Sequence, residues 1–364
     1  MRRPRVKHPH RPRRLGTDRV TIGGTVYKIA AEMRDPDGWI WAMLELLDGT
    51  RTVDQVVGHL VHRFPQYTER ELREGFDRLA ATGYLEDADE PAPPDLTAAE
   101  QERYSRSRSF FQWVDLAPRE SSWDHQRRLR DAKVVLVGVG GTGGAAALAL
   151  AASGVGALHC VEPDVVELSN LNRQILYTEA DIGRPKVEAA LERLRALNSE
   201  IQVTGTRREV RTAEEFIDVL QGYDMLVLGG DRPADIRGLA NEACLKVGVP
   251  WVYGGYHGPQ ITAGVFRPGS GPCYECVRVA DARGRDTGSP QLGWAGEPPV
   301  HAATAISAGM SGNLVAHAAL ALLTGVPRLP VNCAYGMNLA APAHSFVITT
   351  GAPLPGCPAC GGAA

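Results

Sequence analysis

The chain has 364 residues and a formal net charge of −3 at pH 7, with 44% hydrophobic and 22% charged residues. This composition is ordinary for a globular protein, and the length suffices for one full α/β domain and a smaller one. The small charge gives no overall attraction to nucleic acid or to a membrane surface. The first residues have no apolar core and the small-apolar run at 145–152 is short, so we expect neither a secretory signal nor a membrane anchor.

The first 88 residues predict a small domain. Two strand patterns flank Gly23 and Gly24, which favour a tight turn, and three helical patterns follow. Thr68 and Glu71 have the spacing of a capping box at the start of the third helix. The order is typical of a winged-helix (α+β) domain. The predicted elements are strands 20–22 and 25–29, helices 39–47, 53–64 and 69–81, and a short returning strand at 83–86.

Residues 89–100 are rich in proline and acidic residues, which is typical of a linker. Beyond residue 131, apolar strand runs alternate with amphipathic helices. This alternation predicts a second domain, 101–364, of α/β class with a Rossmann-like, doubly wound and mainly parallel sheet. The predicted strands are 134–137, 158–161, 201–204, 225–228 and 251–253.

A glycine-rich loop follows the first of these strands and precedes a helix. Glycines let the backbone approach phosphates closely, and the helix N-terminus supplies free N–H groups and a positive dipole. Taken alone, this loop is equally typical of a dinucleotide-binding domain. The loop glycines are Gly138, Gly140, Gly141 and Gly143.

Charged residues distinguish the alternatives. Glu162 and Asp164 end the second strand, where an acid can bond ribose hydroxyls. Arg173 and Lys186 follow, and a dehydrogenase has no use for both cations on this side of the sheet. Attack at the α-phosphate of ATP does need them, because charge builds on the departing pyrophosphate. Asp231, after the fourth strand, can hold Mg²⁺ against the phosphates.

Four segments together resemble the ThiF/MoeB family, the ubiquitin-activating-enzyme-like adenylyltransferases. They are VLVGVGGTGG at 135–144, VEPDVVELSNLNRQ at 161–174, DIGRPK at 181–186 and LGGDRPADIR at 228–237. The resemblance covers about residues 101–362 and implies an ATP-binding adenylation domain. It assigns the four loop glycines to the phosphates and Asp231 to Mg²⁺. It also assigns a set of side chains to the phosphates and ribose: Asn170, Arg173, Gln174 and Lys186.

The RYSR run at 103–106 resembles the family's RYxRQ segment, whose second arginine reaches into the ATP site of the partner subunit. The resemblance therefore implies a homodimer in which Arg106 completes the other subunit's site. Two residues depart from the family pattern. Glu162 stands where the family has an aspartate, and Ser107 replaces the glutamine that follows the arginine.

Seven cysteines in a chain of this length do not suggest a disulfide framework, and we expect a reducing, cytoplasmic location. Two CxxC pairs predict a tetrahedral Zn²⁺ site with no open position, which is structural, and a redox role is the alternative. The resemblance implies a zinc in the same place. The predicted ligands are Cys273, Cys276, Cys357 and Cys360, whereas Cys160, Cys244 and Cys333 are expected in the core.

The stretch 277–303 contains no cysteine, although family members that form an enzyme thioester carry one there. The sequence therefore favours an acyl-adenylate without a covalent cysteine relay. His257, His301 and His317 show no ligand spacing and are expected to have local structural roles.

The N-terminal segment resembles the PqqD-like recognition element of enzymes that modify ribosomal peptides, through its element order and the run LLDGTRTV at 46–53. Such elements bind a leader peptide as an added strand. Here we expect the open edge at 25–29 to receive it. Seven basic residues within positions 1–14 leave an ordinary DNA-binding winged helix as the alternative, which the mixed charges of helix 69–81 disfavour.

Three functions follow. The first is adenylation of a carboxylate on a leader-bound precursor peptide in ribosomal natural-product (RiPP) biosynthesis. The second is non-catalytic delivery of the peptide to a YcaO-type cyclodehydratase. The third is activation of the C-terminus of a sulfur-carrier protein. The near-complete phosphate-binding set favours the first over the second, and the fused leader-binding element disfavours the third.

Overall fold

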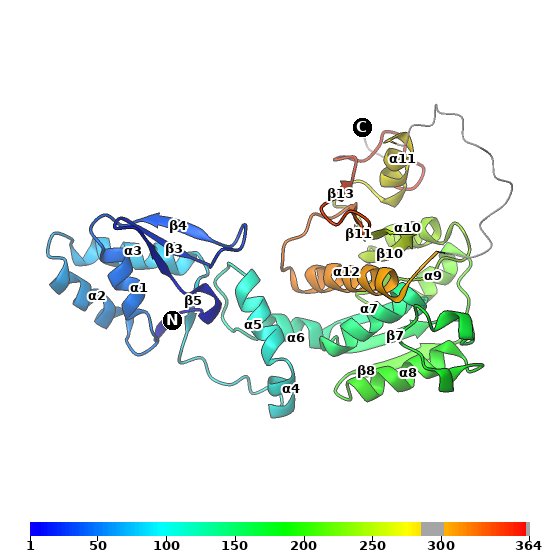
Figure 1. The fold of residues 1–364 in the computed structure, drawn as a ribbon, viewed down its shortest axis with the longest axis horizontal. Coiled ribbons are helices and arrows are strands. Elements are labelled where there is room, and N and C mark those ends of the chain that lie inside the picture. Colours follow the sequence, from blue (N-terminus) through cyan, green and yellow to red (C-terminus); the bar gives the residue numbers. More distant parts are fainter. Residues whose placement is uncertain (285–301, 362–364) are drawn as a thin grey trace. The chain divides into compact units, whose positions relative to one another are not determined.

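The computed structural model describes residues 1–284 and 302–361. The chain, drawn as a ribbon in Figure 1, divides into two compact units, Met1–Arg127 and Arg128–Ala364. Each unit has a buried apolar core. Helix α6 (Asp124–Asp131) crosses from one unit into the other. The domains expected from the sequence, 1–88 and 101–364 with a linker at 89–100, stay predictions beside this division.

The first unit combines two small antiparallel sheets with short helices. One sheet has the order β2-β3-β4, and the other pairs β1 with β5. The strands are β1 (Pro4–Val6), β2 (Arg13–Leu15), β3 (Arg19–Ile22), β4 (Ala31–Arg34) and β5 (Leu85–Asp87). The helices are the 3₁₀ turn η1 (His8–His10), α1 (Trp39–Leu46), α2 (Val53–Arg63), α3 (Glu69–Ala81), α4 (Ala98–Arg103) and α5 (Ser105–Val114).

Helices α1, α2 and α3 confirm the three predicted helices. The capping box of α3 forms as expected: the Glu71 backbone N–H donates to Thr68 Oγ1 at 3.3 Å, and the Thr68 N–H donates to the Glu71 carboxylate at 2.7 Å. Leu72, Phe76 and Leu79 recur on one face of α3 and are buried in the core of the unit.

The first strand of the predicted hairpin, 20–22, forms as part of β3, but the second strand, 25–29, is wrong. Strand β3 pairs with β4 instead. Residues 23–30 form a loop in which the Val26 carbonyl accepts hydrogen bonds from the N–H groups of Ile29 and Ala30 at 3.1 and 3.0 Å. These local backbone bonds form a turn in place of the strand that the alternating pattern suggests. The open edge expected at 25–29 is therefore absent from this unit, and the winged-helix assignment stays a proposal.

The second unit has one eight-stranded sheet with the order β13-β12-β11-β10-β9-β6-β7-β8. The run from β8 to β10 is parallel, and β11, β12 and β13 extend it antiparallel. The fold is thus mixed α/β and Rossmann-like, as predicted. The strands are β6 (Lys133–Val137), β7 (Ala157–Val161), β8 (Gln202–Thr206), β9 (Met225–Leu228), β10 (Trp251–His257), β11 (Gln260–Phe266), β12 (Cys333–Asn338) and β13 (Ser345–Ile348).

Helices cover both faces of this sheet. A side chain at Gly254 of β10 would contact Thr142 and Ser311, whereas one at the next residue, Gly255, would contact Arg237. Because successive residues of a strand face opposite sides, α7 and α12 cover one face and α10 the other. The helices are α7 (Gly141–Ala152), α8 (Lys186–Leu197), α9 (Ala213–Leu220), α10 (Ile236–Val247), α11 (Tyr274–Gly284), α12 (Ala305–Thr324), and the 3₁₀ turns η2 (Leu168–Asn170) and η3 (Glu179–Asp181).

Helix α12 is long and apolar enough to cross a membrane by length and composition alone, but half of its apolar stretch is buried inside the protein. Core helices often share this length and composition. A Cβ at Gly312 would lie only 2.4 Å from the backbone oxygen of Thr142, so α12 packs directly on α7. Its apolar composition is explained by this packing.

The strand order places a topological switch point between β6 and β9. From β6 the chain proceeds to β7 and β8 on one side, and then returns to β9 on the other. Loops leaving the carboxyl ends of two such strands diverge and open a crevice where ligands bind in this class of fold.

Candidate nucleotide site and metal centre

Two of the predicted loop glycines allow backbone segments to approach closely at the crevice. Gly138, after β6, has a φ of 86°, and a Cβ there would lie 2.4 Å from the Gly230 nitrogen. A Cβ at Gly143 would lie 1.9 Å from the Gly138 carbonyl oxygen. The glycine loop, the start of α7 and the end of β9 therefore approach one another backbone to backbone, which a side chain would prevent.

The other two glycines form the N-terminus of α7. Gly140 is the N-cap, without a side-chain capping bond, and Gly141 begins the helix. A Cβ at Gly140 would be 3.6 Å from Gln174 Nε2, and one at Gly141 would be 3.2 Å from the Tyr256 hydroxyl. The first N–H groups of a helix lack partners within the helix, so this end can bind an anion.

Gln174 carries an unmet hydrogen-bonding group beside that helix end. The side chain is only 5% exposed, and its Oε1 atom has no partner among the described residues. Asn170 is also buried and accepts from the Glu167 N–H at 3.1 Å through Oδ1. A buried polar atom without a partner is costly, and a bound ligand that donates a hydrogen bond would satisfy Gln174.

The two acids after β7 differ in their surroundings. Glu162 is 5% exposed, and its carboxylate accepts from the backbone N–H groups of Val139 at 2.9 Å and Asp164 at 3.1 Å. It thereby fastens the glycine loop to the end of β7. Asp164 is exposed and pairs with Lys186, whose Nζ lies 3.2 Å from its Oδ2. The ribose role expected for both acids stays a prediction.

The two predicted cations, Lys186 and Arg173, lie near residues that follow β7 and β6: Lys186 near Asp164, and Arg173 near Gly141. Lys186 is the first residue of α8 and is buried to 6% exposure. Arg173 donates to the Ser169 carbonyl at 2.8 Å and to Asn172 Oδ1 at 2.9 Å.

Tyr256, near the end of β10, is a site residue that the sequence analysis missed. Arg173 hydrogen-bonds to its hydroxyl. Burial raises the pKa of Tyr256. The Arg173 guanidinium lowers this pKa and the exposed Asp231 carboxylate raises it, so both charges lie within electrostatic range of the Tyr256 hydroxyl. Strand β10 was expected to end at residue 253, but it continues to His257 and brings Tyr256 to the N-terminus of α7. The sequence signal for this site residue was an aromatic side chain three positions beyond the expected end of the strand.

Arg106 belongs to the other unit. It lies exposed near the start of α5. Its action on a partner subunit's site stays a prediction.

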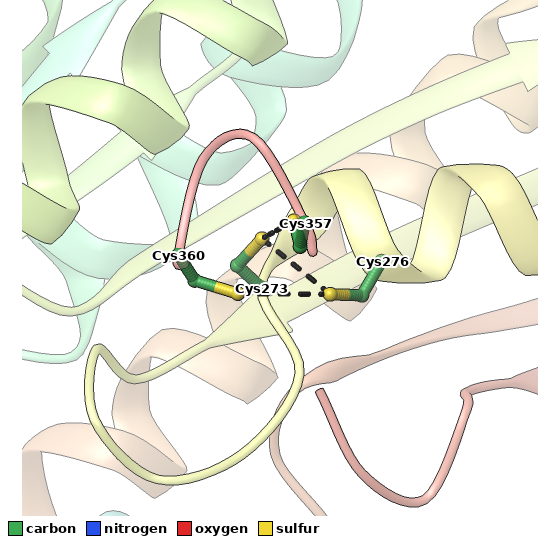
Figure 2. A group of neighbouring side chains, drawn as sticks. All are labelled: Cys273, Cys276, Cys357 and Cys360. Carbon is green, nitrogen blue, oxygen red and sulfur yellow. Dashed lines mark hydrogen bonds between the residues drawn. The ribbon is translucent and has the colours of Figure 1, made fainter. Parts of the chain in front are cut away.

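The four predicted zinc ligands converge although 80 residues lie between Cys276 and Cys357. Cys273 Sγ lies 3.9 Å from Cys276 Sγ and 3.7 Å from Cys357 Sγ, and Cys276 Sγ lies 3.7 Å from Cys360 Sγ (Figure 2). All four sulfurs lie within 4.8 Å of one another. Zn–S bonds of about 2.3 Å in a regular tetrahedron require sulfurs about 3.8 Å apart, so this cluster fits a structural Zn²⁺.

The local environment shifts the thiol pKa values of the cluster in two directions. Burial raises the pKa of Cys273. For Cys357 burial acts in the same direction, but N–H groups of Cys360 and Ala359 outweigh it and lower the pKa to about 7. Metal binding requires thiolates, which these N–H groups stabilise.

The remaining cysteines, Cys160, Cys244 and Cys333, are buried as expected, and burial raises the pKa of Cys160 to about 12. Of the histidines, His257 ends β10, and His317 lies in α12, where burial lowers its pKa. His301 lies outside the described residues.

Comparison with solved structures shows the same fold along nearly the whole chain. E. coli MccB with ATP superposes with a TM-score of 0.76 at 21% identity, covering 98% of this chain and 99% of that one. E. coli MccB with AMPCPP and MccA gives a TM-score of 0.73 at 22% identity, with the same coverage. PaaA gives 0.71 at 22% identity, covering 94% of this chain and 99% of that one.

Curated relatives match a shorter stretch, a little under half of the chain, more closely in sequence. The sulfur carrier protein ThiS adenylyltransferase of Bacillus subtilis (strain 168) is 37% identical over 177 residues, 48% of this chain and 50% of that protein. Adenylyltransferase and sulfurtransferase MOCS3 of Arabidopsis thaliana is 40% identical over 152 residues, 42% of this chain and 32% of that protein. The chain thus spans half or less of the length of these two relatives. A family model described as the ThiF family matches residues 114–358, about two-thirds of the sequence, and the chain belongs to that family.

Proposed function

We propose that this protein is an ATP-dependent adenylyltransferase that activates a carboxylate on a ribosomally made precursor peptide held by its first unit. The observation that carries the nucleotide part is the Oε1 atom of Gln174, which is buried and has no hydrogen-bond partner in the described part of the chain. It lies beside the N-terminus of α7, at the switch point of the sheet. ATP offers both complements: phosphates for the helix end and hydrogen-bond donors for Gln174.

The reaction requires one bond to form and one to break at the α-phosphorus. A substrate carboxylate oxygen bonds to that phosphorus, and the bond to the bridging oxygen of the β-phosphate breaks, which releases pyrophosphate and leaves an acyl-adenylate. Negative charge accumulates on the leaving oxygens. Arg173 and Lys186 stabilise this charge as fixed cations, and the N–H groups at Gly140 and Gly141 bind the phosphate oxygens.

Two metals fit this scheme. Asp231 would hold Mg²⁺, which neutralises phosphate charge when bound. The four cysteines would hold Zn²⁺ as a structural cross-link between 273–276 and 357–360. Because 277–303 contains no cysteine, the acyl-adenylate passes to its acceptor without an enzyme thioester.

The first unit supplies peptide recognition in this proposal, in the manner of a PqqD-like leader-binding element. The likeness to MccB extends over the first unit as well as the second, and MccB has been solved with MccA. Strands β2 and β4 each pair only with β3 among the described residues and offer open edges for an added strand. The proposed assembly is a cytoplasmic homodimer in which Arg106 completes the partner's site.

A second candidate is activation of a sulfur-carrier protein. The curated relatives with that description are 37% identical from Bacillus subtilis and 40% identical from Thermus thermophilus, which favours the same chemistry on a protein C-terminus. Activation of a sulfur-carrier protein does not by itself explain why the chain has the first unit.

Peptide-dependent exchange of labelled pyrophosphate into ATP tests the proposal, with short precursor peptides encoded beside the gene as substrates. Exchange with such a peptide, and none with a sulfur-carrier protein, is expected. Exchange with the carrier protein alone favours the second candidate. If calorimetry detects no ATP binding, catalysis is wrong and delivery of the peptide to a YcaO-type enzyme becomes the better explanation.

A further inference from the structure

The first unit contains a cavity of about 200 Å³ that the adenylation chemistry does not use. An engineered cavity of about 150 Å³ can hold benzene, so this one has room for a single amino-acid side chain. Its wall comes from β5, the end of α5, the loop 115–122 and the start of α6. The side chains that carry the argument are Lys7, Leu85, Phe111, Asp115 and His125.

The wall of the cavity is held in place by a buried carboxylate. Asp115 accepts from Arg119 Nε at 2.7 Å, and its Oδ2 lies 2.6 Å from His125 Nε2. The Asp115 backbone carbonyl accepts from Lys7 Nζ at 3.0 Å. Asp115, His125 and Lys7 are 4%, 3% and 7% exposed. The polar groups around the cavity are thus fixed before any ligand binds, which reduces the entropic cost of binding.

His125 has one ring nitrogen to offer. The Asp115 carboxylate can only accept, so Nε2 of His125 carries the proton of their hydrogen bond. In the neutral ring Nδ1 is then an acceptor, and it is buried without a partner among the described residues. Lys7 Nζ, which donates to the backbone carbonyl of Asp115, is a donor. A ligand that both donates and accepts can meet both groups, as a carboxamide does.

The edge of β5 offers a second point of attachment. The Lys7 N–H donates to the Tyr84 carbonyl and the Ala88 N–H donates to the Arg3 carbonyl, both at 2.9 Å. In an antiparallel ladder alternate residues point their N–H and C=O groups to the same side. Residues 84, 86 and 88 therefore face β1, whereas Leu85 and Asp87 turn theirs away. Both line the cavity, and Leu85 is only 4% exposed.

We infer that this cavity binds the carboxamide side chain of an asparagine or glutamine in an extended peptide that pairs with the open edge of β5 at Leu85. The side-chain N–H donates to His125 Nδ1, its carbonyl accepts from Lys7, and its aliphatic part packs on Phe111. The inference rests on the proposed peptide-directed function and gives it a side-chain specificity: edge pairing supplies affinity, and the pocket selects the residue.

Titration of the full chain with minimal probes, without ATP, tests the inference. The protein is labelled with ¹⁵N-histidine, and the His125 signal is assigned by its loss in His125→Phe. N-acetyl-glutamine methylamide should shift that signal saturably. The leucine and glutamate analogues should bind at least about tenfold more weakly, because one lacks the polar group and the other lacks the donor.

Protein variants and one modified probe separate the two attachments. Lys7→Met keeps the aliphatic stem and removes the ammonium, and it should weaken the glutamine probe about tenfold, whereas Glu120→Gln at the exposed rim should change binding less than about twofold. A glutamine probe methylated on its acetamide nitrogen cannot donate to Leu85 and should also bind more weakly. Neither test relies on His125→Phe being folded.

Equal binding of the leucine and glutamine probes, tighter binding of the glutamate or a serine probe, or no saturable shift at the solubility limit would each overturn the inference. Because these titrations contain no ATP, their failure leaves pyrophosphate exchange untouched. Failure of the exchange reaction, in turn, leaves the titration result standing.

Discussion

A side chain at Gly143 would lie 1.9 Å from the carbonyl oxygen of Gly138, so the first turn of α7 rests directly on the loop that leaves β6. This contact fixes the position of the helix end proposed to bind phosphate. It also makes Gly143 a position where one added methyl group has a large effect.

Gly143→Ala should destabilise the second unit by at least about 2 kcal/mol and abolish ATP binding, because the backbone must move to admit the methyl group. Gly309→Ala is the matched control, since a Cβ there meets nothing within 4 Å in α12. It should be neutral or stabilising by up to about 1 kcal/mol. Chemical denaturation and calorimetric titration with ATP measure both effects, and equal behaviour of the two variants would contradict the packing role.

Arg173→Ala should reduce pyrophosphate exchange by roughly two orders of magnitude or more, because it removes a fixed cation from the leaving group and a partner from Tyr256. Tyr256→Phe, which keeps the ring and loses the hydroxyl, should have a smaller effect. Arg193→Ala, on the exposed side of α8, is the control for loss of an arginine. Unchanged exchange in Arg173→Ala would remove this residue from the mechanism.

Purified protein should contain about one zinc per chain by metal analysis, and Cys276→Ser should lose it together with thermal stability. Cys244→Ala, which removes a buried thiol outside the cluster, should keep the metal. Protein that is free of metal yet folded and active would rule out a structural zinc.

Mixed dimers test the action of Arg106 on the partner site. Arg106→Ala and Asp231→Ala chains should each be impaired alone. Co-expressed with different tags and purified as a mixed dimer, they should recover part of the activity, because one of the two sites then contains both residues. Without recovery in a verified mixed dimer, Arg106 acts within its own chain or has no catalytic role.

Acid should destabilise the first unit through Asp115. Burial raises its pKa, but hydrogen bonds from His125 and Arg119 outweigh this and hold the pKa well below that of an ordinary aspartate. A depressed native pKa gives stability that is present above the unfolded pKa of about 3.9 and is lost as pH falls below it. Hydrogen-exchange protection of 105–125 should therefore fall below about pH 4, and less steeply in Asp115→Asn than in Asp124→Asn.

Much of the second unit could be predicted because its signals are local. Central parallel strands are buried on both faces, so β6 and β9 contain the unbroken apolar runs 134–137 and 225–228. The start of helix α3 could be placed because Thr68 and Glu71 form a capping box there. The cysteine cluster could be predicted from spacing, since a CxxC pair already brings two sulfurs near one metal.

The sequence by itself therefore determined the α/β class, the glycine loop at the start of α7 and the four convergent cysteines. Tertiary structure alone decided that β3 pairs with β4, that β1 pairs with β5, that Glu162 bonds to the glycine loop, and that Tyr256 reaches Arg173. Each of these depends on which segments meet after the chain has folded. Local hydrogen-bonding and periodicity rules carry no information about such pairings, because the competing partners have similar local patterns and differ only in the burial and register available in the complete fold.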